Sequence, residues 1–243
     1  MKKERLELLS SEDLIPIVRK ETENLILYFS CGKDSIAMWL YLQDKGFNII
    51  PVYLYTVPDL RSDDENLSYY EDYFGQHIMR LPHPLFYQML NDLVYQPPER
   101  VATVLSWDLP NYRFADIDDI IAVDKNLDSY YSAMGMRMAD NLDRRMMMYQ
   151  NGVLGSKARR FYYAIWDWNV DQVGEIIRQR KCKIPKVYQF SGRTIAALDY
   201  FYMKPFRKHY PDDYERILEW FPLLEAEFYR YERLANGKEN GKA

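Results

Sequence analysis

The stretch LILYFSCGKDSIAMWLYL, residues 25–42, joins a short apolar run that favours a β-strand to a longer run of good helix formers. Between them lies SCGKDS, residues 30–35, a polar hexapeptide typical of a strand-to-helix turn. The start of a helix carries backbone N–H groups that have no partner within the helix and therefore attract anions. Lys33 adds a mobile positive charge, and Ser30 and Ser35 add hydroxyl groups. These features predict a phosphate-binding loop.

Further strands and helices alternate around this turn. The patterns predict strands over residues 25–29, 47–55, 77–81 and 129–137. They predict helices over residues 3–20, 34–45, 60–75, 84–96, 116–127 and 169–181, and a long helical segment after Tyr210. Glycines at 46 and 75 should end helices, and Pro16 and Pro222 should break the helices that contain them. Pro51, within the strand predicted over 47–55, indicates an edge strand or a bulge. The alternation predicts an α/β fold with a doubly wound parallel sheet flanked by helices. We expect a single domain, residues 1–243, with a helical C-terminal part from about residue 194.

Composition and charge narrow the class of protein. Of the 243 residues, 48% are hydrophobic, enough to bury a core, and the formal net charge of −4 gives no global signal for nucleic acid. The two cysteines, Cys31 and Cys182, form no CxxC pair, so we expect neither a structural zinc site nor an iron–sulfur cluster. The N-terminal stretch lacks the apolar core of a signal peptide, and no apolar run reaches the roughly 18 residues of a membrane span. We therefore expect a soluble cytoplasmic protein without a membrane partner.

The SCGKDS turn follows the first strand, at the end of a parallel sheet where ligands bind. FSCGKDSIAMWLYL resembles the FSGGKDS loop of the N-type ATP pyrophosphatases and of the phosphoadenosine phosphosulfate (PAPS) reductase family. The resemblance implies an adenine nucleotide alpha hydrolase-like fold and a loop that holds phosphate or sulfate of an adenine nucleotide. The loop residues so implied are Ser30, Cys31, Gly32, Lys33, Asp34 and Ser35. The alternative is a capped helix on a polar turn.

Cys31 departs from the family pattern, which has glycine at this position. A cysteine restricts the backbone freedom that glycine gives. It also places a thiol near a helix start and Lys33, conditions that lower a thiol pKa. Two interpretations stay open: a tolerated small side chain and a redox-sensitive loop.

Two later stretches extend the resemblance. GMRMADNLDR, residues 135–144, resembles the family's G-x-R strand end, which implies that Gly135, Arg137 and Arg144 contact the nucleotide or its sulfonyl end. Arginine suits this role because its planar fork binds phosphate bidentately, although most arginines are surface residues. WDWNVDQVGEIIRQRKCKIPKVYQFSGR, residues 166–193, resembles a D-W-x-x-x-D-V helix followed by I-P and Y-x-x-x-G. We interpret most of these matches as architectural, and Arg193 as a further ligand contact.

The absence of a late cysteine decides between the chemistries of the family. PAPS reductases use a C-terminal thiol, and no cysteine follows Cys182 here. The resemblance therefore implies cleavage of ATP between its α- and β-phosphates, with Lys33 and Arg137 in catalytic roles, to activate an unknown acceptor. The alternatives are a PAPS-binding enzyme without its own redox thiol and a nucleotide sensor that works with a partner protein.

Cofactors and partners follow from the same resemblance. We expect ATP or PAPS with Mg²⁺ and no iron–sulfur cluster. The acidic run TVPDLRSDDEN, residues 56–66, either holds that Mg²⁺ or forms a solvated helix start. KARRFYY, residues 157–163, places basic residues beside aromatic rings, which allows nucleic acid as a partner but also fits a solvated turn before a buried strand. A homodimer stays open.

Overall fold

The computed structural model describes residues 8–156, 158–188 and 198–240, and for residues 234–240 it describes the backbone only. The chain forms two compact units. The first, here called the sheet unit, comprises Met1–Leu54, Tyr73–Leu81 and Arg113–Ile184. The second, the helical unit, comprises Tyr55–Asp72, Pro82–Tyr112 and Pro185–Ala243. The assignment of the whole chain to a single domain stays a prediction.

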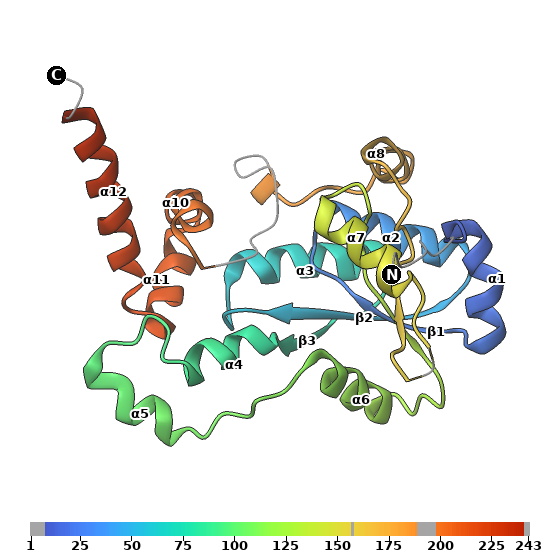
Figure 1. Cartoon of the computed structure of the whole chain (residues 1–243), viewed down its shortest axis with the longest axis horizontal. Helices are drawn as coiled ribbons and strands as arrows, with labels where there is room; N and C mark the ends of the chain where they lie inside the picture. The colour runs from blue at the N-terminus through green and yellow to red at the C-terminus, as the bar shows by residue number, and fades with distance from the viewer. Residues whose placement is uncertain (1–7, 157, 189–197, 241–243) are drawn as a thin grey trace, which may run out of the picture. The chain divides into compact units, whose positions relative to one another are not determined.

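The sheet has five strands in the order β3-β2-β1-β4-β5 (Figure 1). Their bounds are β1 Asn24–Tyr28, β2 Asn48–Tyr55, β3 Met79–Pro82, β4 Tyr131–Ala133 and β5 Phe161–Tyr162. β1 pairs in parallel with both β2 and β4, and β4 pairs in parallel with β5. The chain thus builds the sheet outward from β1 to β3 and then returns to the other side of β1. The order reverses between β1 and β4, which makes this the topological switch point where open α/β sheets bind ligands.

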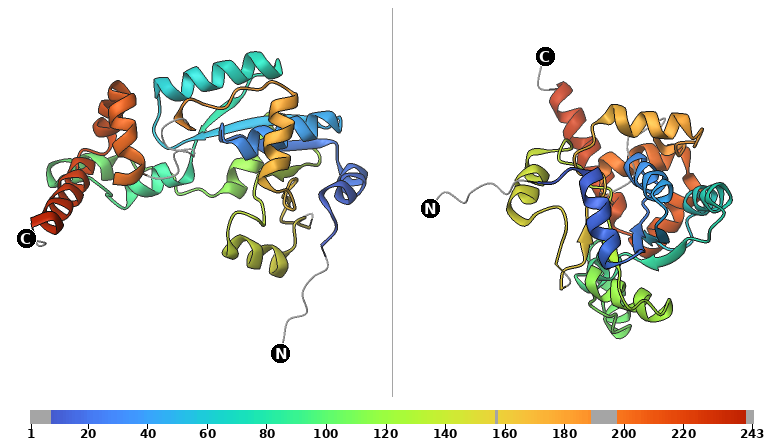
Figure 2. Two further views of the ribbon diagram at one scale, coloured as in Figure 1. Left: turned by 90° about the horizontal axis from the view of Figure 1, so that it is seen from above. Right: turned by 90° about the vertical axis from the view of Figure 1, so that its right-hand side faces the viewer.

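Helices cover both faces of this sheet. The bounds in the sheet unit are α1 Ser11–Glu21, α2 Lys33–Asp44, α6 Phe114–Asp124, α7 Leu142–Asn151 and α8 Val170–Gln179. Successive residues at the end of β1 point to opposite faces: Tyr28 contacts the α6 side through Phe114, and Phe29 contacts Trp39 of α2. α8 packs on α2 and lies over it in Figure 2. The predicted α/β class with a doubly wound parallel sheet is therefore confirmed.

Aromatic packing fixes α2 on the sheet. Every residue of this helix from Ser35 to Leu42 is buried. Trp39 stacks on Phe74 with ring centroids 3.8 Å apart and an interplanar angle of 2°. Phe29 meets both rings edge-on. Because the core holds both the last residues before the turn and the helix after it, the turn between them has little freedom to move.

The helical unit has a core of its own. Its elements are most of α3 (Arg61–Phe74), α4 Pro84–Asn91, the short 3-10 helix Pro98–Arg100, α5 Val101–Ser106, α10 Tyr200–His209, α11 Pro211–Trp220 and α12 Leu224–Asn240. Apolar side chains from these helices form one cluster that includes Phe86, Leu90, Met203, Phe206 and Phe221. Asp213 is buried and accepts hydrogen bonds from the Arg61 and Ser62 N–H groups, both at 2.8 Å, at the start of α3. The predicted break near Pro222 is confirmed, since α11 ends at Trp220 and α12 begins at Leu224.

The predictions for the other two prolines, Pro16 and Pro51, are wrong. Pro16 lies inside α1, whose start is capped by the Ser10 side chain, which accepts a hydrogen bond from the Asp13 N–H group. Pro51 pairs in regular register with Leu27 in β2, which lies between β3 and β1 and is neither an edge strand nor bulged on the β1 side. Proline removes only one hydrogen-bond donor, and the neighbouring backbone holds each element together.

Two predicted elements are longer than those observed. The strand predicted over 129–137 is limited to β4, because the chain bends after Ala133 into the loop that carries Gly135. The helix predicted over 84–96 ends at Asn91, and Leu93 and Tyr95 then adopt positive φ angles of 54° and 55°, which a helix does not allow.

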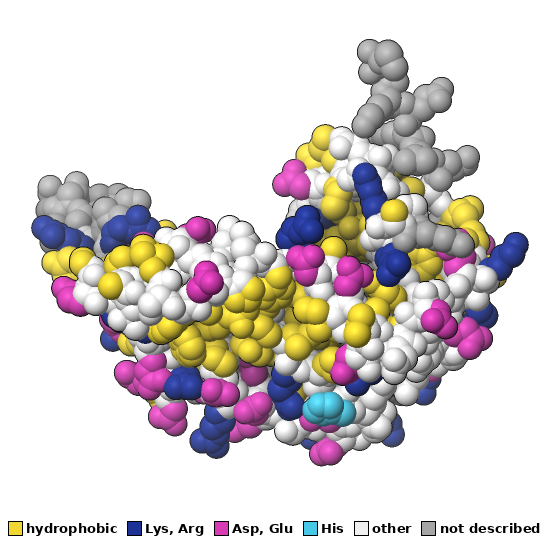
Figure 3. Space-filling model, turned by 90° about the horizontal axis from the view of Figure 1, so that it is seen from below, with side chains coloured by type: hydrophobic (Ala, Val, Ile, Leu, Met, Phe, Trp, Pro, Cys, Tyr) yellow, Lys and Arg dark blue, Asp and Glu magenta, His cyan; other side chains and the backbone are white. Residues whose placement is uncertain are grey.

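Part of the surface is apolar on the face drawn in Figure 3. On α6, Ile120 is 57% exposed and Val123 is 78% exposed.

Among the described helices, none combines the length with the apolar character that a bilayer crossing requires.

Candidate functional site

The turn after β1 places an uncapped helix start at the switch point. α2 begins at Lys33, and its N-cap residue is Gly32, which has no side chain to cap the first-turn N–H groups. The Gly32 carbonyl accepts the first hydrogen bond of the helix, from the Ile36 N–H group at 2.9 Å. N–H groups and the positive end of the helix dipole therefore meet at this point, which favours an anion.

Cys31 adopts the backbone conformation for which glycine is suited. Its φ angle is +56°, in the left-handed region, and the residue is buried. A non-glycine residue in this conformation costs about 1–2 kcal/mol. The loop thus keeps its shape although cysteine stands where the resembled family has glycine.

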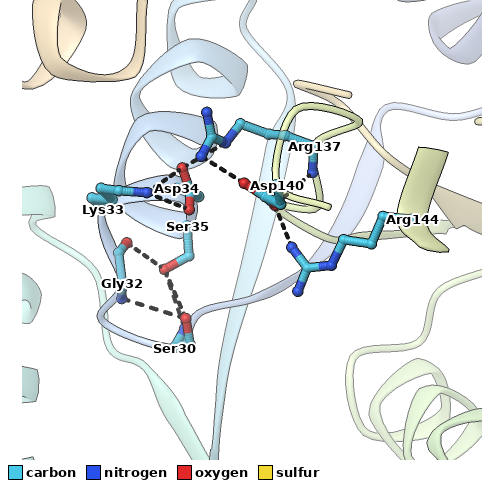
Figure 4. A network of polar contacts seen from close by, with 8 residues as sticks. All are labelled: Ser30, Gly32, Lys33, Asp34, Ser35, Arg137, Asp140 and Arg144. Carbon is cyan, nitrogen blue, oxygen red and sulfur yellow. Dashed lines mark hydrogen bonds and ion pairs between the residues drawn. The ribbon is translucent and has the colours of Figure 1, made fainter. Parts of the chain in front are cut away.

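Two serine side chains hold the strained turn. The Ser35 hydroxyl is buried, donates to the Gly32 carbonyl at 2.9 Å and accepts from the Ser30 N–H group at 3.3 Å. The Ser30 hydroxyl accepts from the Gly32 N–H group at 3.4 Å, and the two hydroxyl oxygens lie 3.3 Å apart (Figure 4). In this structure the serine side chains therefore hold the shape of the loop.

The loop after β4 packs closely on the first turn of α2. A Cβ atom on Gly135 would lie 3.1 Å from the carbonyl carbon of Asp34 and 3.2 Å from the backbone nitrogen of Ser35. Both distances are shorter than ordinary carbon contacts of about 3.5–4.0 Å. The absence of a side chain at Gly135 thus allows the two loops to touch, as the parallel pairing of β1 with β4 requires.

Figure 4 shows a chain of alternating charges that joins the two loops: Lys33, Asp34, Arg137, Asp140 and Arg144. The Asp34 carboxylate lies 2.9 Å from the Lys33 Nζ and 2.8 Å from the Arg137 Nε. The Nε–H bond does not point at that oxygen, so the second contact is an ion pair without a hydrogen bond. The Arg137 side chain is only 5% exposed. The structure thus brings Arg137 to the loop as a buried partner of Asp34.

Asp140 is the one member of this row of charges that does not lie at a position predicted from the sequence to bind the ligand. Its Oδ1 accepts a hydrogen bond from the Arg137 Nη2 at 2.6 Å, and its Oδ2 accepts from the Arg144 Nη1. The three cations and two carboxylates of these five side chains sum to a net charge of about +1. The starts of α2 and α7 add roughly half a positive charge each. The sequence feature that could have indicated Asp140 is its spacing, because it follows Arg137 by three positions and precedes Arg144 by four, as in ion pairs on a helix.

A second titratable pair lies at the end of β1 on the α6 face. The Tyr28 hydroxyl donates a hydrogen bond to the Asp118 carboxylate at 2.7 Å. Burial is the main cause that raises the pKa of the Asp118 carboxyl group above its ordinary value, and the hydrogen bond from Tyr28 opposes it. Burial and the nearby Asp118 charge raise the pKa of Tyr28. This carboxyl group thus favours its protonated form more than an exposed aspartate does.

The stretch 166–193 contributes mostly packing where it is described. Asp167 accepts a hydrogen bond from the Ser11 N–H group at 3.0 Å, at the start of α1. Trp168 packs against Tyr41 with ring centroids 5.0 Å apart. Val173 is buried. Arg193, the remaining predicted ligand contact, lies outside the described residues.

The other predicted binding features lie away from the SCGKDS loop or in the helical unit. Arg160 lies over the Tyr130 ring at 4.5 Å, next to the starts of β4 and β5 and therefore at the opposite end of the parallel strands. Tyr162, two residues later, is fully buried, which fits the turn-and-strand interpretation of residues 157–163; Lys157 itself lies outside the described residues. In the acidic run, Asp59 pairs with Arg216 at 2.8 Å within the helical unit.

Comparisons with known proteins give structural likeness only. No protein-family model and no curated protein matches the chain. The chain is similar to the solved structure of U34-tRNA thiolase NcsA from Methanococcus maripaludis with its [4Fe-4S] cluster: 17% identity, 88% of this chain and 78% of that chain covered, and a TM-score of 0.46. It is also similar to NH3-dependent NAD synthetase from Campylobacter jejuni in complex with the nitrate ion: 10% identity, 90% and 92% covered, and a TM-score of 0.42.

The first of these structures corrects the cofactor prediction, which named ATP or PAPS with Mg²⁺ and excluded an iron–sulfur cluster. NcsA carries a [4Fe-4S] cluster, and the prediction that excluded such a cluster is wrong. Its premise, the number of cysteines, concerns only a cluster held by four thiolates of one chain. Within the described residues both cysteines, Cys31 and Cys182, are buried, and no group of three or more His, Cys, Asp or Glu side chains is placed to hold a metal ion.

Proposed function

We propose that the chain is an ATP-utilising enzyme of the adenine nucleotide alpha hydrolase type, which binds the phosphates of ATP at residues 30–35. The observation that carries this proposal is the meeting of the β1 and β4 loops at the switch point. There an uncapped helix start, Lys33 and a chain of alternating charges converge. This arrangement suits a polyphosphate better than a neutral ligand, because the net positive charge and the helix dipole act on the same point.

Three of the charged residues that join the two loops take distinct roles in the proposal. Lys33 and the first-turn N–H groups of α2 contact phosphate oxygens. Arg137 is buried and paired on both sides, so it holds Asp34 in place and strengthens the local positive field rather than reaching out to the ligand. Arg144, with 39% of its side chain exposed, is the arginine that reaches the nucleotide.

The reaction we propose is transfer of adenylate. A nucleophilic atom of the acceptor attacks the α-phosphorus of ATP, and the bond from that phosphorus to the oxygen bridging to the β-phosphate breaks. Pyrophosphate leaves with the electron pair, and an acceptor–adenylate forms. The protein supplies position and charge stabilisation, for which preorganised N–H groups and a lysine are suited and no protein nucleophile is needed.

Ligand preference tests the proposal. We expect calorimetric titration to give tighter binding of ATP than of PAPS, and Lys33→Ala to weaken ATP binding. Tighter binding of PAPS would favour the thiol-free sulfonucleotide enzyme instead. ATP binding without pyrophosphate formation in the presence of cell-extract fractions as acceptor source would favour the nucleotide sensor. A wild-type chain that binds neither nucleotide would refute the proposal.

A further inference from the structure

We infer that Asp140 is a positioning residue that holds Arg144 toward the phosphate site, an inference that rests on the proposed function. Asp140 uses its two carboxylate oxygens for two different arginines: Oδ1 for the Nη2 of Arg137 at 2.6 Å, and Oδ2 for the Nη1 of Arg144. Oδ2 also lies 3.3 Å from the Arg137 backbone nitrogen, which donates to it. One carboxylate therefore joins the buried arginine of the site to the more exposed one.

The position of Arg144 gives the carboxylate a task. Arg144 lies in the first turn of α7, and its own N–H group donates to the N-cap Asn141 at 2.8 Å. The positive end of a helix dipole repels a cation there, so an arginine in this turn needs a nearby anion to stay close. Asp140 supplies that anion from the position just before the cap.

Exposure follows the same order along the chain. The side chains of Arg137, Asp140 and Arg144 are 5%, 17% and 39% exposed. The first of these arginines is therefore committed to the protein interior, and the second lies where a dissolved anion can reach it. Asp140 transmits the fixed position of the buried arginine to the exposed one, and a preorganised arginine loses less entropy when it binds phosphate.

The chemistry of Asp140 suggests a sharp substitution. In Asp140→Asn one of the two oxygens becomes an NH₂ group, which is a donor and faces a guanidinium donor. The variant keeps the size of the side chain but loses one of the two arginine contacts. Asp143→Asn is the matched control, because Asp143 lies in the same first turn of α7, is exposed and has the same charge.

The binding test uses ATP and, as a probe without nucleoside, inorganic pyrophosphate. We expect Asp140→Asn and Arg144→Gln each to weaken calorimetric affinity about tenfold or more, as the loss of a charge-assisted contact does. Asp143→Asn should stay within about twofold of the wild type. If Asp140 acts through Arg144, the double variant should bind no more weakly than Arg144→Gln alone. A further tenfold loss in the double variant, or an unchanged affinity of Asp140→Asn, would overturn the inference.

A measurement without ligand separates this inference from the proposed function. In NMR, the Arg144 Nε–Hε signal, assigned by its loss in Arg144→Gln, should show restricted motion in the wild type and in Asp143→Asn but free motion in Asp140→Asn. If the signal behaves so while ATP does not bind, the proposed function fails and the positioning role stands. If ATP binds but this side chain is as mobile in the wild type as in Asp140→Asn, the positioning role fails alone. Equal melting temperatures of the asparagine variants would show that both fold.

Discussion

Replacing Gly135 with alanine would test whether the two loops must touch for the site to form. The new Cβ atom would lie 3.1 Å from the Asp34 carbonyl carbon and 3.2 Å from its oxygen, so the backbone must move apart by about 0.4 Å or more to reach ordinary contact. Overpacking of this kind costs about 1–3 kcal/mol, and alanine returns about 0.4–1 kcal/mol by restricting the unfolded chain. We predict a net loss of about 1–2 kcal/mol in the free energy of unfolding.

The same shift should weaken nucleotide binding, because it moves the loop of Arg137 away from Asp34. In the wild type the Arg137 Nε lies 2.8 Å from the Asp34 Oδ1. Thermal melting and calorimetric titration with ATP measure the two effects. Gly174→Ala is the matched control: Gly174 lies inside α8, where the nearest atom to a new Cβ is the Arg178 Nη2 at 3.8 Å, so alanine should raise stability by about 0.5–1 kcal/mol. If Gly135→Ala melts as high as Gly174→Ala and binds ATP like the wild type, the close approach has no functional meaning.

Three further predictions concern single residues of the sheet unit. Lys33→Ala should weaken ATP binding by about 10- to 150-fold, the equivalent of 1.5–3 kcal/mol, whereas Lys45→Ala at the far end of α2 should not; equal effects in titration would contradict a phosphate role. Cys31→Val should melt below Cys31→Gly, since a β-branched residue at φ +56° is strained and glycine is not; the reverse order would show that strain is unimportant there. Asp118→Asn should be more stable than the wild type at pH 7, by denaturant unfolding. The pKa of Asp118 in the folded state is raised above the ordinary 3.8, so between these two pKa values the folded chain binds more protons than the unfolded chain. The free energy of unfolding therefore falls as the pH rises from 3.8 through the folded-state pKa. The advantage of asparagine should therefore shrink toward pH 4, and an advantage that stays constant with pH would rule out titration of this carboxyl group as its cause.

Local signals in the sequence predicted local structure well. Gly46 and Gly75 end α2 and α3 as predicted, with positive φ angles of 72° and 64°. Pro51 was misleading because its effect depends on which strands lie beside β2, and this is a property of the whole sheet. Alternation of apolar runs and turns was sufficient to predict the parallel sheet, since few other arrangements bury such a pattern.

The site was predicted only in part, for a similar reason. The SCGKDS turn and the Gly135–Arg137 loop could be located because each follows a strand, and parallel strands end at one edge of the sheet. The sequence pattern carries no information on exposure, so it could not indicate that the side chain of Arg137 is almost completely buried. Asp140 was missed because its spacing to two arginines gains meaning only once the start of α7 is known.

The pairing of β1 with β4 has a consequence for the order of events during synthesis. Leu25 lies beside Tyr131, so the two loops of the proposed phosphate site are separated by about a hundred residues of sequence, and the second is synthesised that much later. A ribosome that has produced the SCGKDS turn still has to release β4 and α7 before Asp34 meets its arginine. Until then the turn has neither its closing loop nor most of its cations. Formation of the proposed nucleotide site is therefore tied to a late, long-range docking step, and any condition that delays this step also delays the appearance of that site.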